Sequence, residues 1–563
     1  MRLAASILTF LLVESSLVAA NYGVAGVVVD SQSQTPLANV RVSLAPTTTR
    51  DQKLEQVTKQ DGRFSFAVDA AGKYTLLIAK PGYPPQSYKQ DGVSGFSSAI
   101  VVGDGQDTRQ IVFQANRGGV ISGQVKDEDS EPVGNALVAV FQAVVQAGER
   151  RVIRRGQTRA NAAGEFRFAN LARGSYYVCA MGRPWFADSL IRFQQLQEAR
   201  NRLPLNRRFT PTNQSNESTI EPASADPNFR GTAFTTTFYP NAQSVEEAST
   251  VQVAAGGEAQ VSITLPLSKA VTLKGSISLG GETSGHANLV KKIDGQAMSF
   301  LEEEVGKDGT FVFRNVPAGV YEIEAASQSS FGPTSWSIRQ DVAVGTADME
   351  IALKPPNMGS LSGKVNLEGE TAPPPANFFV SLRDEKGIIA RAEAEVGPNG
   401  SFSLSRLPPG KYEVTAAFSN FIAAYLMGPG GEYLPLTVEI APGMTVLRDL
   451  TMARAASVIQ GRVEKGGAPL VGAFVLLMPK DPSRRWAYRA DQTDSDGSYR
   501  LATISSGDYL LIALTEGGDI AYRDAKIASI LARTAKPVHV EPDARLELKL
   551  DVVDIATLNL PRR

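Results

Sequence analysis

Hydrophobic and polar residues alternate in short runs along most of this chain, and one arrangement of these runs recurs five times. Each recurrence opens with a β-prone run around a glycine, at Gly26, Gly123, Gly275, Gly363 and Gly461. A second glycine follows at a turn, at Gly62, Gly164, Gly309, Gly400 and Gly497. Alternation with a period of two predicts strands that bury one face. Its recurrence predicts a tandem array of related units.

The residues after the second glycine keep one register in all five repeats. An aromatic stands two residues on, another large apolar residue four on, a glycine ten on and a tyrosine twelve on; the tyrosines are Tyr74, Tyr176, Tyr321, Tyr412 and Tyr509. The first two positions share one face of a strand and predict core residues. A tyrosine that starts the next strand resembles the tyrosine corner of β-sandwiches, with a buried ring and a hydroxyl bonded to backbone. We therefore predict a structural role for the five tyrosines.

About seven short strands in each repeat of roughly a hundred residues predict an all-β chain of five tandem, seven-stranded Greek-key β-sandwich domains. The repeats place them at 22–115, 116–268, 269–356, 357–455 and 456–553. The second is longer because it carries an insertion at 186–239. Within the insertion, apolar spacing predicts a helix over 188–202, and the Asn-, Ser- and Pro-rich remainder predicts a mobile loop.

The repeat motif resembles a known family. Gly-x-Val is followed by Pro-Leu-x-x-Val at 36–40, by Asp-Gly-x-Phe-x-Phe at 61–66 and by Pro-x-Gly-x-Tyr at 317–321. This combination is similar to the carboxypeptidase regulatory-like domain, here in what looks like a bacterial exported protein. The resemblance implies a prealbumin-like or Ig-like sandwich, similar in fold to carbohydrate-binding modules. Such sandwiches host many unrelated roles, so the motif indicates fold more than function.

The first twenty residues predict export. Arg2 precedes an apolar core from Leu3 to Val13, and the small residues before Asn21 are typical of cleavage after Ala20. No later apolar run approaches the roughly 18 residues that a membrane span needs. A periplasmic, cell-surface or extracellular location fits equally. Cys179 is the one cysteine, so no intramolecular disulfide is expected, and its alternating context predicts a small buried hydrophobe.

Charge and composition exclude several function classes. Lys and Arg number 57 against 58 Asp and Glu, a balance that gives no drive toward nucleic acid. The two histidines, His286 and His539, fall in different repeats, and no zinc-peptidase, nucleophile-elbow or phosphate-loop motif is present. We therefore expect neither catalysis nor a cofactor or metal. The run 494–497 resembles half a calcium loop, but a plain turn is the favoured interpretation.

Two sets of residues are candidates for ligand contact. The stretch 117–208 holds 15 Lys and Arg against 8 Asp and Glu, with Arg154 and Arg155 in one hairpin. It is either a solvated face or a patch for an anionic polymer such as acidic polysaccharide. Trp185, Trp486 and Tyr488 are either packing residues or solvent-edge aromatics on which sugar rings stack.

These observations favour an exported, non-catalytic, modular binding or structural protein. Five semi-rigid sandwiches in tandem would act as a spacer that presents an extended surface, with carbohydrate or cell-envelope polysaccharide as the best single ligand. The alternative is a protein–protein adhesion or envelope-assembly scaffold that docks another envelope protein through exposed sheet edges.

Overall fold

The structure is a computed structural model. It describes residues 22–49, 52–90, 95–184, 231–277, 285–293, 296–327, 337–354, 357–370, 374, 378–384, 390–418, 421–428 and 432–561. The predicted export signal, Trp185 and the predicted helix at 188–202 lie outside these residues. The described part of the chain is dominated by strands, which confirms the all-β prediction.

The first repeat forms two facing sheets that we call sandwich 1. One sheet has the order β4-β1-β8, and the other has the order β3-β2-β5-β6 with β7 also paired to β5. The strands are β1 (Tyr22–Asp30), β2 (Arg41–Pro46), β3 (Leu54–Val57), β4 (Arg63–Val68), β5 (Gly72–Lys80), β6 (Tyr83–Ser87), β7 (Ile100–Val102) and β8 (Ile111–Ala115). The opening strand lies in the middle of its sheet, antiparallel to β4 and parallel to β8. Alternate residues of β4 are buried in the core between the sheets, as the pattern predicts.

Sandwich 2 repeats this plan with the sheets β12-β9-β17 and β11-β10-β13-β15, and β16 also pairs with β13. Its strands are β9 (Gly119–Asp127), β10 (Leu137–Gln146), β11 (Glu149–Arg159), β12 (Glu165–Leu171), β13 (Gly174–Met181), β15 (Thr237–Phe238), β16 (Val251–Val253) and β17 (Glu258–Leu265). The end of the insertion returns to this sheet through β15.

Sandwich 3 has the sheets β14-β18-β21, with β24 also on β18, and β20-β19-β22-β23. Its strands are β14 (Thr232–Phe234), β18 (Leu267–Ile277), β19 (Gly285–Ile293), β20 (Gln296–Val305), β21 (Thr310–Pro317), β22 (Gly319–Ser327), β23 (Ser337–Val344) and β24 (Met349–Leu353). β14 belongs to the insertion of the second repeat but pairs with the start of β18. This strand and the single residue Pro266 between β17 and β18 tie sandwiches 2 and 3 together.

Sandwich 4 has the sheets β28-β25-β35-β31-β30, joined by β32 and β34, and β27-β26-β29-β33. Its strands are β25 (Gly359–Leu367), β26 (Phe379–Asp384), β27 (Ala390–Glu395), β28 (Ser401–Leu407), β29 (Gly410–Thr415), β30 (Ala417–Phe418), β31 (Phe421–Met427), β32 (Tyr433–Leu434), β33 (Thr437–Ile440), β34 (Thr445–Leu447) and β35 (Asp449–Arg454).

Sandwich 5 has the sheets β37-β36-β40, joined by β43 and β44, and β39-β38-β41-β42. Its elements are β36 (Ser457–Lys465), β37 (Ala468–Pro469), β38 (Phe474–Pro479), η3 (Arg485–Ala487), β39 (Arg489–Gln492), β40 (Ser498–Ile504), β41 (Gly507–Leu514), α2 (Ala525–Ala532), β42 (Lys536–Val540), β43 (Arg545–Glu547), β44 (Leu550–Asp551) and η4 (Ile555–Leu558). The helix α2 has no counterpart among the elements predicted from the sequence pattern. Asp524 caps it by accepting from the backbone N–H groups of Lys526 and Ile527.

Each sandwich encloses one hydrophobic cluster between its two sheets. The opening glycine of each repeat has no room for a side chain: a Cβ on Gly461 would lie 1.9 Å from the carbonyl oxygen of Leu548. The turn glycines adopt the positive φ that their dipeptides predict, such as 67° at Gly62. The domain boundaries stay our proposal for where the chain divides.

The five repeat tyrosines form the corners that the sequence predicts. Each ring is buried. Each hydroxyl donates to the carbonyl oxygen four residues earlier: Tyr74 to Ala70 (2.8 Å), Tyr176 to Ala172 (2.6 Å), Tyr321 to Pro317 (3.0 Å), Tyr412 to Pro408 (2.6 Å) and Tyr509 to Ser505 (2.8 Å). Burial raises the pKa of Tyr176 to about 12, although the nearby charge of Arg155 opposes this. The role of these residues is structural.

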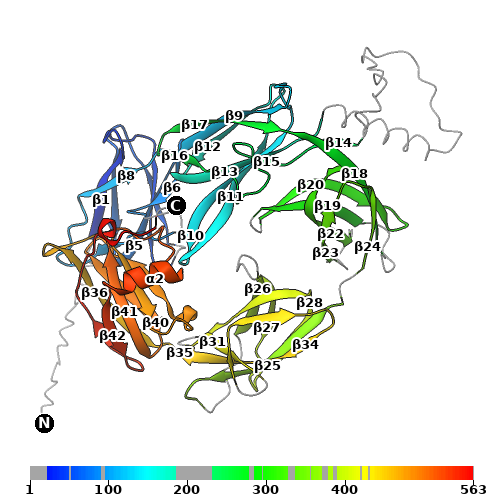
Figure 1. The fold of residues 1–563 in the computed structure, drawn as a ribbon. Coiled ribbons are helices and arrows are strands. Elements are labelled where there is room, and N and C mark those ends of the chain that lie inside the picture. The colour runs from blue at the N-terminus through cyan, green and yellow to red at the C-terminus, as the bar shows by residue number, and fades with distance from the viewer. Residues whose placement is uncertain are drawn as a thin grey trace, which may run out of the picture.

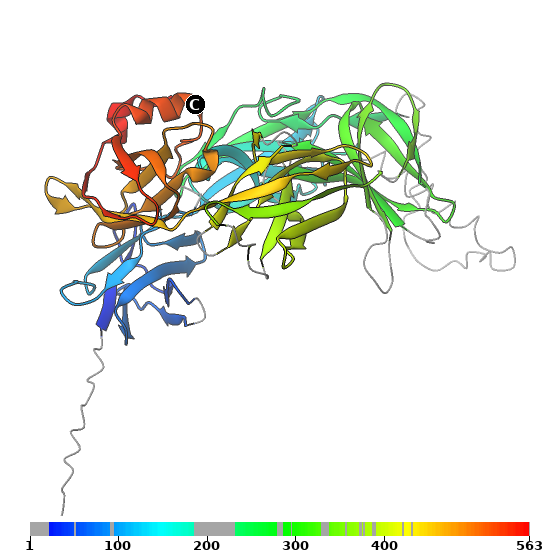
Figure 2. The ribbon, with the colours of Figure 1, turned by 90° about the horizontal axis from the view of Figure 1, so that it is seen from below.

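The sandwiches are arranged as a ring (Figure 1), and the last sandwich lies beside the first in both views (Figure 2). An apolar cluster joins sandwiches 1, 2 and 5; we call it the triple junction. The fully buried Phe474 of β38 meets Phe96 of sandwich 1 edge-to-face at 5.1 Å between ring centroids. Val145 of the β10–β11 hairpin packs into the same cluster, beside Tyr522 and α2. The chain pattern left the arrangement of the sandwiches open, and the structure closes them into a ring.

Polar contacts extend the closure between sandwiches 5 and 1. The Asp494 carboxylate accepts from the Ala99 N–H at 2.8 Å and pairs with Lys73. The Ser495 N–H donates to the carbonyl oxygen of Ala99 at 2.9 Å, and the Ser98 hydroxyl donates to the carbonyl oxygen of Thr493 at 2.7 Å. The run that resembles half a calcium loop thus serves as a docking turn for sandwich 1.

The tyrosine corner of sandwich 2 can be tested by comparing two variants. Tyr176→Phe removes a buried donor to the Ala172 carbonyl and should lower the unfolding free energy of this sandwich by about 1–2 kcal/mol, seen in calorimetry as a lower midpoint. Tyr177→Phe, in the same strand, removes a half-buried hydroxyl that has no hydrogen-bond partner among the described residues and is the control. Equal midpoints for the two variants would contradict the corner.

Ring closure makes a second prediction. The Ser495 N–H donates to the Ala99 carbonyl oxygen, so an Ala99→Cys/Ser495→Cys variant should form a disulfide between these two positions under oxidising conditions. The link encloses most of the chain and should raise mobility in non-reducing electrophoresis. Each single variant is a control, since the native Cys179 is buried. A double variant that stays fully reduced under oxidant would contradict a closed ring.

Candidate ligand-binding pocket

One of the predicted aromatic residues, Trp486, lines a pocket between sandwiches 4 and 5, which we call the Trp486 pocket. Its volume is about 550 Å³, within the range of small-molecule sites. Sandwich 5 contributes Asp481, Ser483, Arg484, Trp486, Ser505 and Ser506; sandwich 4 contributes Glu368, Ala424, Tyr425, Leu434, Pro435 and Ala453. The pocket therefore exists only where the two sandwiches meet.

The turn after β38 positions the tryptophan. Ala487 of the 3₁₀ turn η3 is buried, while Trp486 is half-buried and packs against the edge of the sandwich 5 core. The Arg484 guanidinium lies 5.0 Å from the Trp486 ring centroid and 5.7 Å from that of Tyr509. This cation–π stack supports one side of the indole and limits its motion.

Sandwich 5 also holds Arg484 in place. Its Nη2 donates to the Ser505 hydroxyl at 2.7 Å and to the Ser506 carbonyl oxygen at 3.0 Å. Gly507 makes room for it, since a Cβ there would lie 2.3 Å from Nη1 of Arg484. The repeat glycine at this position has φ of 139°, a conformation that favours glycine. The repeat architecture itself therefore makes the space that Arg484 occupies.

Acidic and hydroxyl groups surround the aromatic ring. Asp481 accepts from the Ser483 hydroxyl at 2.7 Å and from the Ser483 N–H at 2.9 Å, and these bonds lower its pKa below the usual value. It stays ionised at neutral pH and acts as an acceptor. Glu368 adds a second carboxylate from sandwich 4. An aromatic face beside fixed acceptors and an arginine suits a ligand that has both apolar faces and hydroxyl groups.

The other predicted residues do not gather at this pocket. Tyr488 stacks on Tyr522 at 5.7 Å between ring centroids and lies 5.8 Å from the Arg523 guanidinium, so it packs in the triple junction. Trp185 lies outside the described residues. Arg154 and Arg155 are adjacent but separate at a register shift in β11: Arg154 lies opposite Phe141, whereas Nε of Arg155 donates to Oε1 of Gln142 at 2.8 Å.

The β10–β11 hairpin that carries the two arginines docks on sandwich 5. At its tip, Glu149 pairs with Arg485 at 3.0 Å and with Arg523 at 3.6 Å. Burial alone would raise the pKa of Glu149, but the hydrogen bond from Arg485 and the charges of Arg523, Arg485 and Arg151 lower it overall. Two arginines of sandwich 5 therefore help to hold the hairpin of sandwich 2 in the ring.

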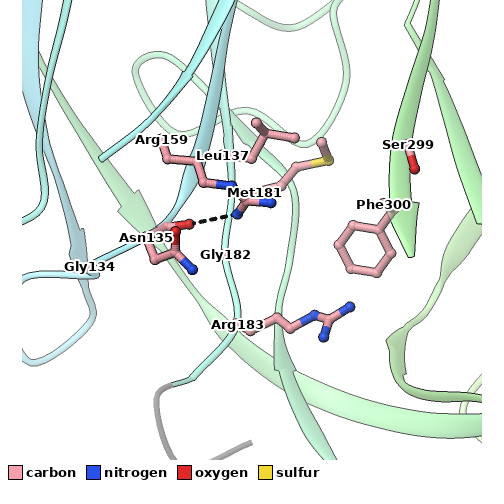
Figure 3. Close-up of a pocket in the computed structure, with 9 residues that line it drawn as sticks. All are labelled: Gly134, Asn135, Leu137, Arg159, Met181, Gly182, Arg183, Ser299 and Phe300. Atoms are coloured by element: carbon pink, nitrogen blue, oxygen red, sulfur yellow. Dashed lines mark hydrogen bonds between the residues drawn. The ribbon is translucent and has the colours of Figure 1, made fainter. Parts of the chain in front are cut away.

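A second hollow lies between sandwiches 2 and 3 (Figure 3); we call it the Arg159 groove. Arg159, Arg183 and Phe300 surround it, together with Asn135 and Ser299. The two arginines belong to the basic stretch 117–208, where nothing in the pattern distinguishes them from their neighbours. Phe300 comes from the other sandwich, so no local signal could have linked it to them.

The groove borders an apolar contact between the same two sandwiches. Phe141 and Met181 of sandwich 2 pack there with Ile293 and Met298 of sandwich 3. Cys179 lies in this contact and is fully buried, which confirms its prediction as a small hydrophobe. Burial raises the pKa of its thiol to about 12, so it stays protonated and unreactive. This contact fixes the two walls of the groove.

In the part of the chain that the structure describes, no group of three or more His, Cys, Asp or Glu side chains is placed to hold a metal ion. Among the same residues, no helix combines the length and apolar character that crossing a bilayer requires.

Residues 23–114, which form sandwich 1, match the family model of the carboxypeptidase regulatory-like domain. The family resemblance is therefore confirmed for the first repeat. A comparison with curated proteins finds no match.

Several solved structures are similar to parts of the chain. The Bacillus anthracis TIE protein is 10% identical with a TM-score of 0.16, over 77% of this chain and 69% of that one. GBS52, the minor pilin of Streptococcus agalactiae, is 15% identical with a TM-score of 0.20, over 33% and 96%. BcpA, the major pilin of Bacillus cereus, is 11% identical with a TM-score of 0.14, over 60% and 100%. With TM-scores this low, these likenesses carry no argument about function.

Proposed function

We propose that this protein is an exported, non-catalytic binding protein that holds carbohydrate in the Trp486 pocket. The observation that supports this best is the fixed indole of Trp486 in a hollow of about 550 Å³ at the junction of two sandwiches. Sugar rings have apolar faces that pack on aromatic rings and equatorial hydroxyl groups that need directional partners. The pocket offers both kinds of contact within one site.

The arrangement suits binding rather than reaction. Arg484 is engaged by Ser505 and Ser506, and Asp481 is held ionised by Ser483, so neither is poised to transfer a proton. A glycosidase would need one carboxyl group whose pKa is raised so that it can act as an acid. Asp481 has the opposite shift.

The proposal predicts saturable glycan binding that depends on Trp486. The full chain is screened against neutral and acidic cell-envelope glycans, and a ligand that binds is titrated while the indole fluorescence is recorded. Trp486→Ala should weaken the affinity about tenfold or more, because it removes the stacking face. Trp486→Phe should keep part of the affinity and lose most of the fluorescence change.

Phe379→Ala is the matched control. It removes another exposed aromatic ring, 51% accessible, from sandwich 4 outside the pocket. This variant should bind like the parent chain. Equal affinity of the parent chain and Trp486→Ala would contradict the proposal. A chain that binds no glycan would leave the protein–protein scaffold as the working hypothesis.

A further inference from the structure

We propose that the Arg159 groove is a second binding site, specific for the carboxylate-bearing sugars of an acidic polysaccharide. This inference does not depend on the Trp486 pocket, which lies between other sandwiches. It rests on the side chains that meet where sandwich 3 packs against the outer face of sandwich 2.

Register along β10 and β11 places the cationic wall. Leu137 lies opposite Arg159, and Phe141 lies opposite Arg154. Paired residues of an antiparallel ladder project to the same face, and Leu137 and Phe141 both pack in the contact with sandwich 3. Arg159 therefore projects from the face that sandwich 3 partly covers. Arg183, just after β13, reaches the same hollow from the neighbouring strand (Figure 3).

Arg159 is oriented but retains binding capacity. Its Nη1 donates to the Asn135 carbonyl oxygen at 3.2 Å, the contact drawn in Figure 3. A guanidinium has five N–H donors in a planar fork, so further donors remain for a ligand. The fork matches a carboxylate, which it binds through two parallel hydrogen bonds. One arginine held by backbone and a second beside it form a suitable receptor for such groups.

The opposite wall supplies the surface for a sugar ring. Phe300 of β20 is half-buried and packs against Tyr321 at 5.7 Å between ring centroids, which fixes its ring. The adjacent Ser299 is exposed and offers a hydroxyl. Two cations facing an aromatic ring match a uronate, which carries a carboxylate on a ring with an apolar face.

The shape favours a polymer over a single small anion. The hollow of about 210 Å³ in Figure 3 continues into a second of about 480 Å³, which shares Leu137, Arg159, Arg183, Ser299 and Phe300. On its other side, Arg159 and Arg167 line a third hollow of about 480 Å³. Arg159 thus stands at the centre of a track that runs across the edge of sandwich 2.

The acidic residues along the track set its selectivity. Glu302 lines the second hollow and Glu165 lines the third, where Asn161 donates to it at 2.9 Å. A negative charge in each of these two hollows disfavours a densely charged chain such as a polyphosphate. A polysaccharide that carries one carboxylate per sugar on an otherwise neutral chain fits a groove in which cationic and anionic side chains alternate.

The test uses the full chain with a galacturonan oligosaccharide and the same oligosaccharide fully methyl-esterified, which keeps the sugars and removes the charge. The unesterified probe should bind saturably and more weakly as salt is raised. The methyl ester should bind at least about tenfold more weakly, since it cannot accept the paired hydrogen bonds.

Arg159→Gln/Arg183→Gln should reduce the affinity for galacturonan about tenfold or more, with the same melting temperature as the parent chain. Arg63→Gln/Arg500→Gln removes two exposed arginines elsewhere and is the matched control. If the double variant has a lower melting temperature than the parent chain, Arg183→Lys replaces it in the test. This variant keeps the positive charge but loses the planar guanidinium fork, so it too should bind galacturonan more weakly.

Three results would overturn the proposal: equal binding of both oligosaccharides, equal affinity of the groove variant and its control, or equally tight binding of poly-glutamate. The last would show a polyanion surface without sugar specificity. Trp486→Ala should bind galacturonan like the parent chain. Loss of galacturonan binding in Trp486→Ala alone would assign it to the other pocket, so the two proposals fail separately.

Discussion

Packing of Phe474 against Phe96, Val145 and Tyr522 is the contact on which the arrangement of the chain depends. It joins the last sandwich to the first two and turns a linear array into a ring. In an open array each junction sets only its own angle, and small rotations accumulate along the chain. Once the ends are joined, a rotation at one junction requires compensating rotations at others. The apolar cluster supplies the driving force, because burial of aromatic area outweighs exposed ion pairs.

Polar contacts between sandwiches 5 and 1 determine how sandwich 5 is positioned on sandwich 1. Asp494 is nearly buried and is satisfied by the Ala99 N–H and Lys73, so a different register would leave its charge unpaired. Asp30 has the same role between sandwiches 1 and 2, where it accepts from Arg117 at 2.6 Å and from Tyr83 at 2.8 Å. Burial opposes the ionisation of Asp30, but these bonds and two backbone N–H donors hold its pKa well below the usual range.

What the sequence predicts well is what depends on neighbours along the chain. Positive φ at Gly62, the shared face of Phe64 and Phe66 and the corner of Tyr74 all follow from contacts within a few residues, so they recur in every repeat. Closure involves residues separated by hundreds of positions. Phe474 looks like any core residue of an alternating strand, and only the distant Phe96 distinguishes it. The eight-residue helix α2 is likewise too short to give a periodic signal and is stabilised by the apolar cluster that it covers.

The same distinction explains the candidate sites. Trp486 could be singled out because it is one of three tryptophans and follows two arginines, but Glu368 and Tyr425 line the pocket from a different sandwich. Arg154 and Arg155 are adjacent residues of the same type, so the sequence does not distinguish them. The register shift in β11 gives them different partners. The Arg159 groove could not be predicted from the sequence, because it depends on where Phe300 lies relative to Arg159. That position is set by how sandwich 3 packs on sandwich 2.

Both candidate sites lie at junctions, and this follows from the sandwich itself. A small β-sandwich fills its interior with side chains and presents shallow outer faces, so concave surfaces arise mainly where two such units meet. A hollow between two units is a good receptor only if the units hold their relative positions, because ordering them on binding costs free energy. Ring closure removes much of that cost in advance, since the walls contributed by sandwiches 2 and 3, and by 4 and 5, are restrained from both ends of the chain. The triple junction, which includes Tyr488 two residues from Trp486, therefore helps to hold the walls of both proposed sites in place.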